Sequence, residues 1–583
     1  MFRLLKNLTK REFILIIIST ILIILDVALE LKLPDYMSNI TVLVQTEGSY
    51  FIDILINGGY MMLCTASSLV ISIIASYIIA EVTSKFSYIT REKLYNKILG
   101  LDLDNIKGFK TSSLITRTTN DITQIENLLG FGLQMLIKAP VTAVWAITKI
   151  LNKNIEWSIA TIIAVIIIII NLAIIMVRVL PRFKIVQSLI DKINGVIREN
   201  LLGIRVVRAF NAEYYSKKRF EVVNEDLTDN QLKNQKLFAL LSPVMFLVMN
   251  TLALAIYAIG AVLINQSILA EKLTLFSNMV VFYSYSIQVI MSFLMLVMVF
   301  MMLPRANVSS KRILEVLDSV NTLIDGNNKI NKEAGTVEFK NVSFKYFDAE
   351  ESVLENISFK VGKGETIAFI GSTGSGKSTL INLIPRFYDV SSGEVLVDGV
   401  NVKDYTKEDL NKKIGYISQK PVIFSGTVKS NVAFGNFDNI SDEDVNKALE
   451  ISQASEFVNK MDKGINAKIS QGGINLSGGQ KQRLAIARGI AKKPEILIFD
   501  DSFSALDYKT DSLLRKSIQE NLKDTTVMIV AQRIGTIMNA DKIVVLDNGK
   551  CVGVGTHKEL LKSCKIYKEI ALSQLTKEEL ENA

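Results

Sequence analysis

Residues 365–379 read E-T-I-A-F-I-G-S-T-G-S-G-K-S-T, an apolar, strand-like run that leads directly into a glycine-rich turn. The turn from Gly371 to Ser378 fits the pattern G-x-x-x-x-G-K-[ST], and it follows a strand, as that pattern requires. Its glycines allow backbone N–H groups to surround a phosphate, while Lys377 is placed for the β- and γ-phosphates and Ser378 for Mg²⁺. The stretch therefore predicts an α/β domain with a phosphate-binding P-loop.

Two further stretches support a phosphate site. The apolar run 496–499 ends in Asp500, whose carboxylate can meet a magnesium ion through water. The sequence L-S-G-G-Q at 476–480 precedes a helical stretch, 481–491, so small residues at a helix start again offer N–H donors to an anion. Alone, this second stretch is better explained as an ordinary serine-capped helix start. Its combination with Gln419 and Asp507 favours a role in nucleotide binding.

The first half of the chain is much more hydrophobic. Of 583 residues, 49% are hydrophobic and 21% are charged, a composition that excludes disordered and collagen-like chains. Crossing a bilayer takes about 20 apolar residues. Uncharged runs of this kind occur at 61–80, 159–177, 238–263 and 273–303, and less clean runs that contain charges occur at 13–33 and 128–150. We therefore expect six membrane-spanning helices.

The charge of the connecting loops predicts how the helices are oriented. The long stretches 81–127 and 180–237 contain 7 and 11 Lys or Arg residues, whereas 34–60, 151–158 and 264–272 contain 0, 1 and 1. Basic residues collect in the cytoplasmic loops of membrane proteins. We expect a multi-pass protein of the cytoplasmic membrane, with the N-terminus, both long loops and everything after the sixth span in the cytoplasm. This topology also explains the net charge of +8, so no nucleic-acid partner is expected.

Composition also divides the chain into domains. We predict a membrane domain over residues 1–303, a linker over 304–335 and a nucleotide-binding domain over 336–583. The linker begins at Pro304, has mixed charge and contains the turn-forming sequence D-G-N-N. In the second long loop, around 197–210, apolar residues recur at helical spacing, so helices are expected to extend out of the membrane.

In combination, these features resemble the ATP-binding cassette (ABC) exporter family, and the resemblance covers essentially the whole chain. It implies a half-transporter: a polytopic α-helical membrane domain of six helices, in the type IV ABC architecture, fused to one α/β P-loop nucleotide-binding domain. It also implies that ATP and Mg²⁺ are the cofactors and that two such domains enclose two ATP molecules. Residues 117–121 (R-T-T-N-D) and 199–210 resemble the intracellular loops whose tips dock on these domains.

The resemblance assigns roles to individual residues. Tyr346 corresponds to the aromatic residue that stacks on adenine, Gln419 to the Q-loop glutamine and Asp507 to the end of the D-loop. The implied nucleotide-binding residues are Tyr346, Gly371, Ser372, Thr373, Gly374, Ser375, Gly376, Lys377, Ser378, Thr379, Leu476, Ser477, Gly478, Gly479, Gln480 and Asp507. The implied metal-binding residues are Ser378, Gln419 and Asp500, and the implied catalytic positions are Gln419, Asp501 and Gln532.

Two of these positions depart from the family pattern. The general base of the family is a glutamate, but this chain has Asp501, whose carboxylate is set back by roughly 1.5 Å. A misplacement of about 1 Å can cost about a hundredfold in rate. The switch histidine of the family is replaced by Gln532, which can donate to a γ-phosphate but cannot take the proton that an imidazole takes. We therefore expect impaired hydrolysis at this chain's own site.

The signature sequence 476–480 and the D-loop are intact, so this chain can complete a nucleotide site whose P-loop belongs to a partner. We hypothesise a heterodimer with a second ABC half-transporter that carries the missing glutamate and histidine. A homodimer that hydrolyses ATP slowly is the alternative. The expected function is ATP-driven, multidrug-type export of small hydrophobic or amphipathic compounds. Export of lipids, lipopeptides or peptides, or an ATP-gated regulatory or sensor module, are the other functions that the sequence allows.

Three weaker features remain. The single histidine, His557, is expected to have a surface or capping role. Asp26 and Glu30 lie four residues apart in the first span, and therefore on one helical face, where they could attract cationic substrates or simply pack. Methionines at 291, 295, 298, 301 and 302 make the sixth span adaptable, as at promiscuous binding surfaces, although such stripes more often pack or face lipid.

Overall fold

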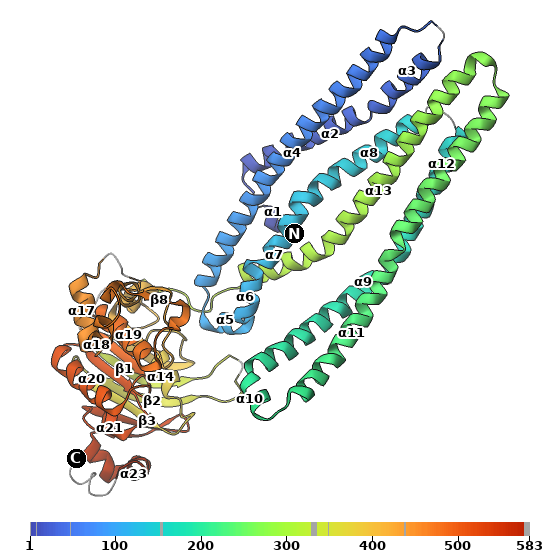
Figure 1. The fold of residues 1–583 in the computed structure, drawn as a ribbon. Coiled ribbons are helices and arrows are strands. Elements are labelled where there is room, and N and C mark those ends of the chain that lie inside the picture. Colours follow the sequence, from blue (N-terminus) through green and yellow to red (C-terminus); the bar gives the residue numbers. More distant parts are fainter. Residues whose placement is uncertain are drawn as a thin grey trace. The chain divides into compact units, whose positions relative to one another are not determined.

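A computed structural model describes residues 2–6, 8–46, 48–151, 155–327, 335–347, 349–435 and 439–575. The chain forms two compact units (Figure 1). The first unit consists of Met1–Gly100 and Thr111–Ser319, and the second of Leu101–Lys110 and Val320–Ala583. A ten-residue segment from the first half of the sequence therefore belongs to the second unit.

The first unit is built from long helices, shown from blue to green in Figure 1. Six stretches of the described chain are long and apolar enough to cross a membrane, which confirms the expected number of spans. The longer helices are α2 (Lys10–Glu30), α3 (Leu33–Gln45), α4 (Phe51–Leu99), α8 (Leu133–Leu151), α9 (Ile155–Leu202), α11 (Glu213–Ala239), α12 (Leu241–Gln266) and α13 (Leu269–Leu317). The shorter ones are α1 (Phe2–Leu5), α6 (Thr111–Thr118), α7 (Asn120–Asn127), a π-helix (Leu128–Gly132) and α10 (Ile204–Ala209).

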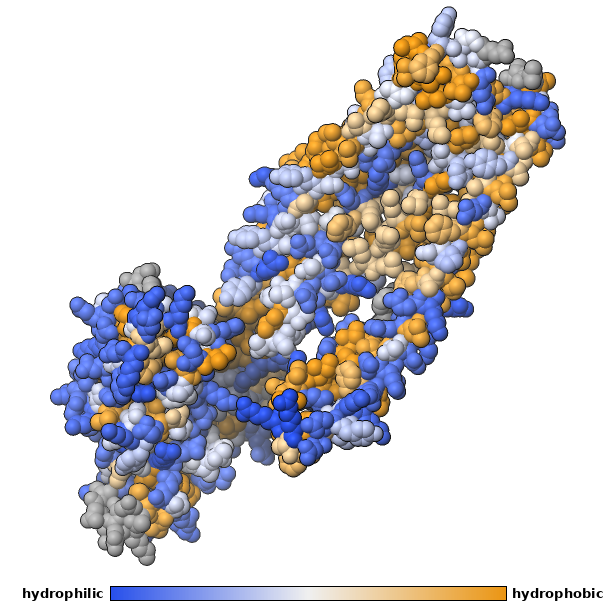
Figure 2. Space-filling view, in the orientation of Figure 1, coloured by the Kyte–Doolittle hydropathy of each residue, from blue (hydrophilic) through white to orange (hydrophobic). Residues whose placement is uncertain are grey.

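Three helices are much longer than a bilayer requires. Helices α4, α9 and α13 have 49, 48 and 49 residues. At 1.5 Å per residue each is about 70 Å long, against about 30 Å for the hydrocarbon core. Their apolar segments are exposed, and Figure 2 shows hydrophobic residues gathered along this unit, whereas the visible face of the second unit is mostly hydrophilic. This pattern is the one expected of helices that cross the bilayer and continue beyond it.

The linker was predicted to begin at Pro304, and this was wrong. Helix α13 runs through Pro304 and ends at Leu317. A proline inside a helix removes one backbone hydrogen bond but need not end the helix. The turns that follow are held by packing, because Ala306, Ile313 and Val316 are fully buried.

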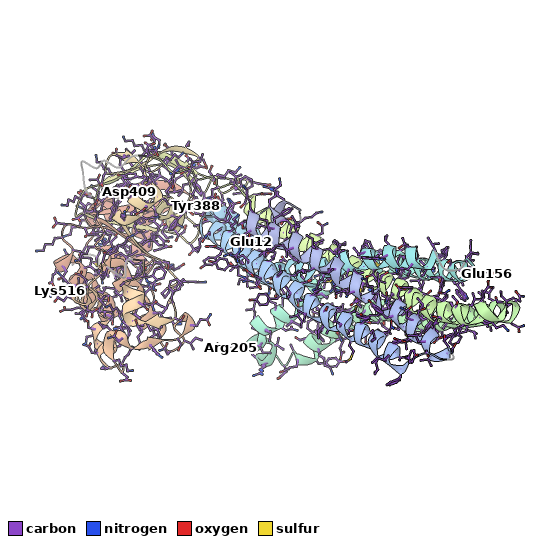
Figure 3. The ribbon with its side chains drawn as sticks, turned by 90° about the horizontal axis from the view of Figure 1, so that it is seen from above. Glu12, Glu156, Arg205, Tyr388, Asp409 and Lys516 are labelled. Carbon is purple, nitrogen blue, oxygen red and sulfur yellow. The ribbon has the colours of Figure 1, made fainter. Side chains whose placement is uncertain are left out.

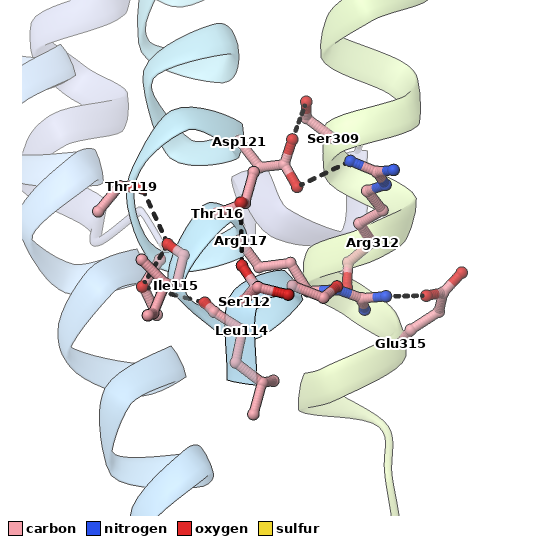
Figure 4. Close-up of polar contacts among 12 residues, drawn as sticks. Ser112, Leu114, Ile115, Thr116, Arg117, Thr119, Asp121, Ser309, Arg312 and Glu315 are labelled. Atoms are coloured by element: carbon pink, nitrogen blue, oxygen red, sulfur yellow. Dashed lines mark hydrogen bonds and ion pairs between the residues drawn. The ribbon is translucent and has the colours of Figure 1, made fainter. Parts of the chain in front are cut away.

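The segment 117–121, which resembles a loop whose tip docks on the nucleotide-binding domain, forms polar contacts within the first unit (Figure 4). Arg117 forms an ion pair of 2.9 Å with Glu315 of α13. Asp121 accepts a hydrogen bond of 2.8 Å from the hydroxyl of Ser309. The segment therefore fastens α6 and α7 to α13. Helix α5 (Leu103–Phe109), from the same long connection between spans, belongs to the second unit.

The second unit contains two main sheets. The first has the strand order β2-β1-β4-β5 and is antiparallel, with strands β1 (Val337–Phe344), β2 (Leu354–Val361), β4 (Ser392–Val397) and β5 (Val400–Asn401). The second has the order β12-β11-β3-β10-β9-β6, with strands β3 (Thr366–Gly371), β6 (Ile414–Ile417), β9 (Ile496–Asp500), β10 (Thr526–Val530), β11 (Lys542–Asp547) and β12 (Lys550–Gly555). A short pair, β7 (Gly426–Thr427) and β8 (Lys468–Ile469), completes the strands.

The second sheet is parallel except for β12. Parallel sheets are covered on both faces, and every residue of β9 and β10 is buried accordingly. The helices of this unit, besides α5, are α14 (Lys377–Asn382), α15 (Lys407–Lys413), α16 (Val428–Val432), α17 (Asp442–Ile451), α18 (Ser455–Asn459), α19 (Gly478–Ala491), α20 (Tyr508–Asn521), α21 (Ile534–Ile537), α22 (His557–Ser563) and α23 (Lys565–Leu572). Short 3₁₀ turns lie at Gly464–Asn466 and Gln471–Gly473.

The expectation that His557 lies at the surface was also wrong. Its side chain is buried, and its Nδ1 atom lies 2.6 Å from the hydroxyl oxygen of Tyr567 in α23. Burial lowers the pKa of His557. The helix cap is Thr556, whose side chain accepts from the N–H of Glu559. His557 therefore packs α22 against α23.

Lys413 gives a test of the packing of the second unit. Its ammonium donates to Asp398 and to Glu495, both at 2.6 Å, and the Asp398 side chain is fully buried. We expect Lys413→Met to destabilise this unit by about 3–5 kcal/mol, because it leaves a buried carboxylate without its partner. Thermal melting of the purified chain measures this change. The neighbouring variant Lys412→Met removes an exposed ion pair with Glu408 and should leave the melting temperature nearly unchanged.

Candidate functional site

The site lies where three neighbouring strands end. Strand β10 pairs in parallel with both β3 and β9, so the carboxyl ends of all three strands meet at one edge of the sheet. The P-loop follows β3, Asp500 is the last residue of β9, and Gln532 follows β10. Ligands bind at this kind of edge in open α/β sheets.

The P-loop adopts its turn through glycine. Gly374 and Gly376 have φ values of 85° and 92°, in the left-handed region that side chains disfavour. A Cβ atom on Gly376 would also lie 2.7 Å from the Cδ2 atom of Leu354. The loop then leads directly into α14, whose first residue is Lys377. The sequence pattern thus predicted both the position and the backbone requirement of this turn.

Lys377 folds back into its own loop. Its ammonium donates to the carbonyl oxygens of Gly371 at 2.9 Å and Ser372 at 2.7 Å, and to the hydroxyl of Ser375 at 3.3 Å. Burial lowers the pKa of Lys377, and the carboxylates of Asp501 and Asp500 act in the opposite direction. A buried cation at the mouth of a glycine-rich loop is suited to bind a phosphate.

Ser378 and Asp500, two of the residues assigned to the metal, lie in contact. The hydroxyl of Ser378 donates to Oδ1 of Asp500 at 2.7 Å. The hydroxyl of Tyr416, from β6, contacts Oδ2 of Asp500 at 3.3 Å and Asn382 at 2.9 Å. Burial raises the pKa of Asp500. A hydroxyl beside a carboxylate matches the oxygen ligands that Mg²⁺ prefers when phosphates supply the rest, so these two residues fit the ion. Sequence reasoning missed Tyr416, which no motif marks.

Gln419 lies elsewhere in the site, on Asp501. Its amide nitrogen donates to Oδ2 of Asp501 at 2.9 Å, and the amide nitrogen of Gln532 donates to the same oxygen at 2.8 Å. Asp501 is buried, has a φ of 48° and donates its N–H to the carbonyl of Val530 at 3.1 Å. The three positions assigned to catalysis therefore meet in one contact, in which two neutral amides hold one carboxylate oxygen.

Tyr346 lies beside the P-loop and is contacted by helix α5. Its hydroxyl is 3.1 Å from the hydroxyl of Thr379, the residue that follows the P-loop. The ammonium of Lys107 in α5 lies over the Tyr346 ring, 4.9 Å from its centre, and donates to the hydroxyl of Tyr388 at 2.7 Å. Tyr388 is labelled in Figure 3. Although burial opposes it, the hydrogen bond with Tyr388 raises the pKa of Lys107.

Hydrogen bonds at the N-terminal cap of helix α5 also connect this helix to the rest of the second unit. Asp102 caps α5 by accepting from the N–H of Asn105 at 3.0 Å, and it also accepts from the N–H of Thr322 at 2.8 Å. Burial alone would raise the pKa of Asp102, but these hydrogen bonds outweigh it and lower the pKa. Sequence reasoning missed Lys107, Tyr388 and this cap. No motif indicates that residues 102–107, which lie far from the P-loop in the sequence, belong to the site.

The remaining predicted residues make local contacts. Ser477 caps α19: its hydroxyl accepts from the N–H of Gln480 at 3.3 Å, and Gln480 accepts from the N–H of Ser477 at 2.9 Å. Asp507 caps α20 by accepting from the N–H of Thr510 at 3.0 Å. In the described part of the chain, these contacts do not join the signature or the D-loop to the P-loop.

Comparison with known proteins supports this picture. Residues 13–301 match the family model of the ABC transporter transmembrane region, and residues 354–504 match that of the ABC transporter. A solved bacterial Atm1-family ABC exporter with ATP bound is similar with a TM-score of 0.82 and 25% sequence identity, over 97% of this chain and 100% of that chain.

Two relatives extend the comparison. The chain is 31% identical to the ATP-dependent lipid A-core flippase of Aromatoleum aromaticum, over 87% of this chain and 83% of the relative. It is also 31% identical to a Bacillus subtilis protein named provisionally as a multidrug export ATP-binding/permease protein, over 84% of this chain and 83% of the relative. With its six apolar spans and its P-loop domain, the chain belongs to the ABC transporter family and has the fold of an exporter half-transporter.

Proposed function

We propose that the chain exports hydrophobic or amphipathic compounds across the cytoplasmic membrane, as one half of a heterodimeric ABC exporter. One observation carries the asymmetric part of this proposal: a single oxygen of Asp501 accepts both the Gln419 and the Gln532 amides. A carboxylate whose oxygen is held by two donors is a poor base for an attacking water. The chain then binds MgATP at its own P-loop and hydrolyses it slowly.

The proposed heterodimer rests on two comparisons with the family pattern. The signature sequence is kept, whereas the base and switch positions are changed. The signature serine and glutamine hold each other in a capping box at the start of α19, with the two glycines between them. This arrangement leaves the helix start free of bulky side chains, as a site for the phosphates of a partner-bound nucleotide requires. The partner would supply a glutamate and a histidine at the positions that Asp501 and Gln532 occupy here.

The export class is supported by the relatives, one of which is named for multidrug export and another as a lipid A-core flippase. The first name describes the export of drugs and the second the movement of a lipid across a membrane. A pumping transporter accumulates a hydrophobic dye in inside-out vesicles when ATP is added, whereas an ATP-gated regulatory module does not. This measurement, on the chain expressed with its partner, tests the export function.

The catalytic part is tested with the purified chain alone. We expect very slow ATP hydrolysis, and we expect the double variant Asp501→Glu with Gln532→His to raise the turnover by about a hundredfold, because it restores both the reach of the carboxylate and a titratable imidazole. Each single change should give much less, since Asp501→Glu keeps the amide of Gln532 and Gln532→His keeps the shorter carboxylate. Steady-state ATPase assays in detergent measure all four proteins.

Adding Lys377→Ala to the double variant is the control, and it should abolish the restored activity by removing the phosphate contact. Brisk ATP turnover by the unaltered chain, at the level that the double variant was expected to reach, would contradict the impaired site and favour an active homodimer.

Tyr346 is proposed to stack on adenine, and Lys107 then competes for the same ring. A cation over an aromatic ring contributes about 0.5–2 kcal/mol. We therefore expect Lys107→Met to tighten ATP binding about two- to thirtyfold and to leave the binding of inorganic tripolyphosphate, which has no base, unchanged. Isothermal titration of the two ligands measures this split.

The matched control is Lys110→Gln, which removes a charge at the end of the same helix. Equal changes for ATP and tripolyphosphate would point to a structural defect, and weaker ATP binding would show that Lys107 supports the stacking instead of competing with it.

A further inference from the structure

Three membrane helices carry polar residues spaced four apart, and the structure brings these residues together. Asp26 and Glu30 lie on α2, Ser68, Ser72 and Ser76 on α4, and Gln134 and Lys138 on α8. A spacing of four places each set on one face of its helix. We call these seven residues the polar column.

Hydrogen bonds join the three helices within the polar column. The ammonium of Lys138 donates to Asp26 at 3.0 Å and to Glu30 at 2.8 Å. The hydroxyl of Ser68 donates to Asp26 at 2.6 Å, and the side chain of Asp26 is 4% exposed. Elsewhere in the polar column, the amide nitrogen of Gln134 donates to the hydroxyl of Ser76 at 2.7 Å. The two acids that sequence analysis singled out are therefore partly neutralised by Lys138.

The polar column borders a cavity of about 200 Å³. Its polar lining consists of Asp26, Ser72, Ser76, Gln134 and Lys138, and its apolar lining includes Ile23 and Met295. Pockets for drug-sized ligands measure about 300–1,000 Å³, so this cavity suits a head group and not a whole amphiphile. A π-helix, Leu128–Gly132, immediately precedes α8, and such helices occur often at functional sites.

The charge of the polar column favours a cationic ligand. The charges of Asp26 and Lys138 in the cavity wall cancel, and Glu30, which pairs with Lys138 from outside the wall, gives the polar column a formal charge of −1. Acceptors also dominate the cavity wall: the Asp26 carboxylate, the Gln134 carbonyl oxygen and the serine hydroxyls can all accept, while Lys138 already donates to two oxygens. Placing charges within a membrane segment is costly, and such groups usually mark a substrate path.

We propose that this cavity binds the primary ammonium head group of an amphipathic substrate. The three N–H donors of the ammonium match the acceptors of the wall, and Glu30 acts from outside the wall by offsetting the charge of Lys138. The flexible side chain of Met295, from α13, accommodates the start of the apolar part. This inference rests on the proposed export function and names the substrate class.

The test uses the full chain in phosphatidylcholine nanodiscs, with empty nanodiscs subtracted. Two probes differ only in their head group: a dansyl-tagged undecylammonium and the corresponding dansyl-tagged undecanoate. Fluorescence titration should show that the ammonium probe binds about tenfold or more tightly than the carboxylate probe, because a charge-assisted hydrogen bond is lost or reversed with the latter.

Variants then separate recognition from packing. Glu30→Gln removes the excess charge but keeps the Asp26–Lys138 pair, and it should weaken ammonium binding about tenfold without weakening carboxylate binding. Ser72→Ala should weaken the ammonium probe about two- to fivefold. The matched controls are Glu271→Gln at the exposed start of α13 and Ser67→Ala, one residue from Ser68 on α4 but outside the polar column, and both should bind as the unaltered chain does.

Equal affinity for the two probes, or unchanged ammonium binding in Glu30→Gln, would overturn the proposal. Melting temperature and ATP binding of each variant report on folding, so a general defect is distinguished from a lost subsite. Because this assay measures binding and not transport, its failure would leave the proposed export untouched. Absence of ATP-driven dye accumulation would overturn export while leaving the binding result intact.

Discussion

Parallel pairing of one central strand with two neighbours is the constraint on which the nucleotide site depends. Because β10 pairs with β3 on one side and β9 on the other, three loops that are distant in sequence are forced to the same edge. Both faces of these strands are covered, so a slip by one residue would move every side chain into the packing of the opposite face, where its shape does not fit. The contacts of Lys377, Asp500 and Asp501 follow from this register and not from any one motif.

In the membrane unit, the corresponding constraint is that charges away from water need partners. Four charges in the two less clean runs, 13–33 and 128–150, form ion pairs between helices: Lys138 pairs with Asp26 and Glu30, and Lys149 pairs with Asp35, two residues beyond the first run, at 2.7 Å. Asp35 also accepts from the buried hydroxyl of Tyr285 at 2.8 Å. The charged residues that make these spans harder to recognise from hydropathy therefore form specific ion pairs between helices in the folded chain.

Sequence reasoning succeeded where the physical signal is local. Three features can be recognised from the residues of their own segment alone, and the structure contains all three: the P-loop turn at its glycines, the apolar strand that ends in Asp500 and the six apolar runs. It failed where the outcome depends on packing between distant segments. Pro304 reads as a boundary, yet buried neighbours carry the helix through it, and His557 reads as polar surface, yet Tyr567 buries it. Likewise no motif could predict that Lys107 lies over Tyr346 or that two glutamines contact Asp501, because each of these contacts joins segments that are distant in the sequence.

The membership of residues 101–110 in the second unit has a mechanical consequence. This short segment is inserted between two parts of the first unit, so the chain passes between the units three times: near Gly100, near Lys110 and near Ser319. Helix α4 ends just before Gly100, and Lys110 has a φ of 61°. A single cut in the backbone at any one of these joints would therefore leave the two units covalently linked.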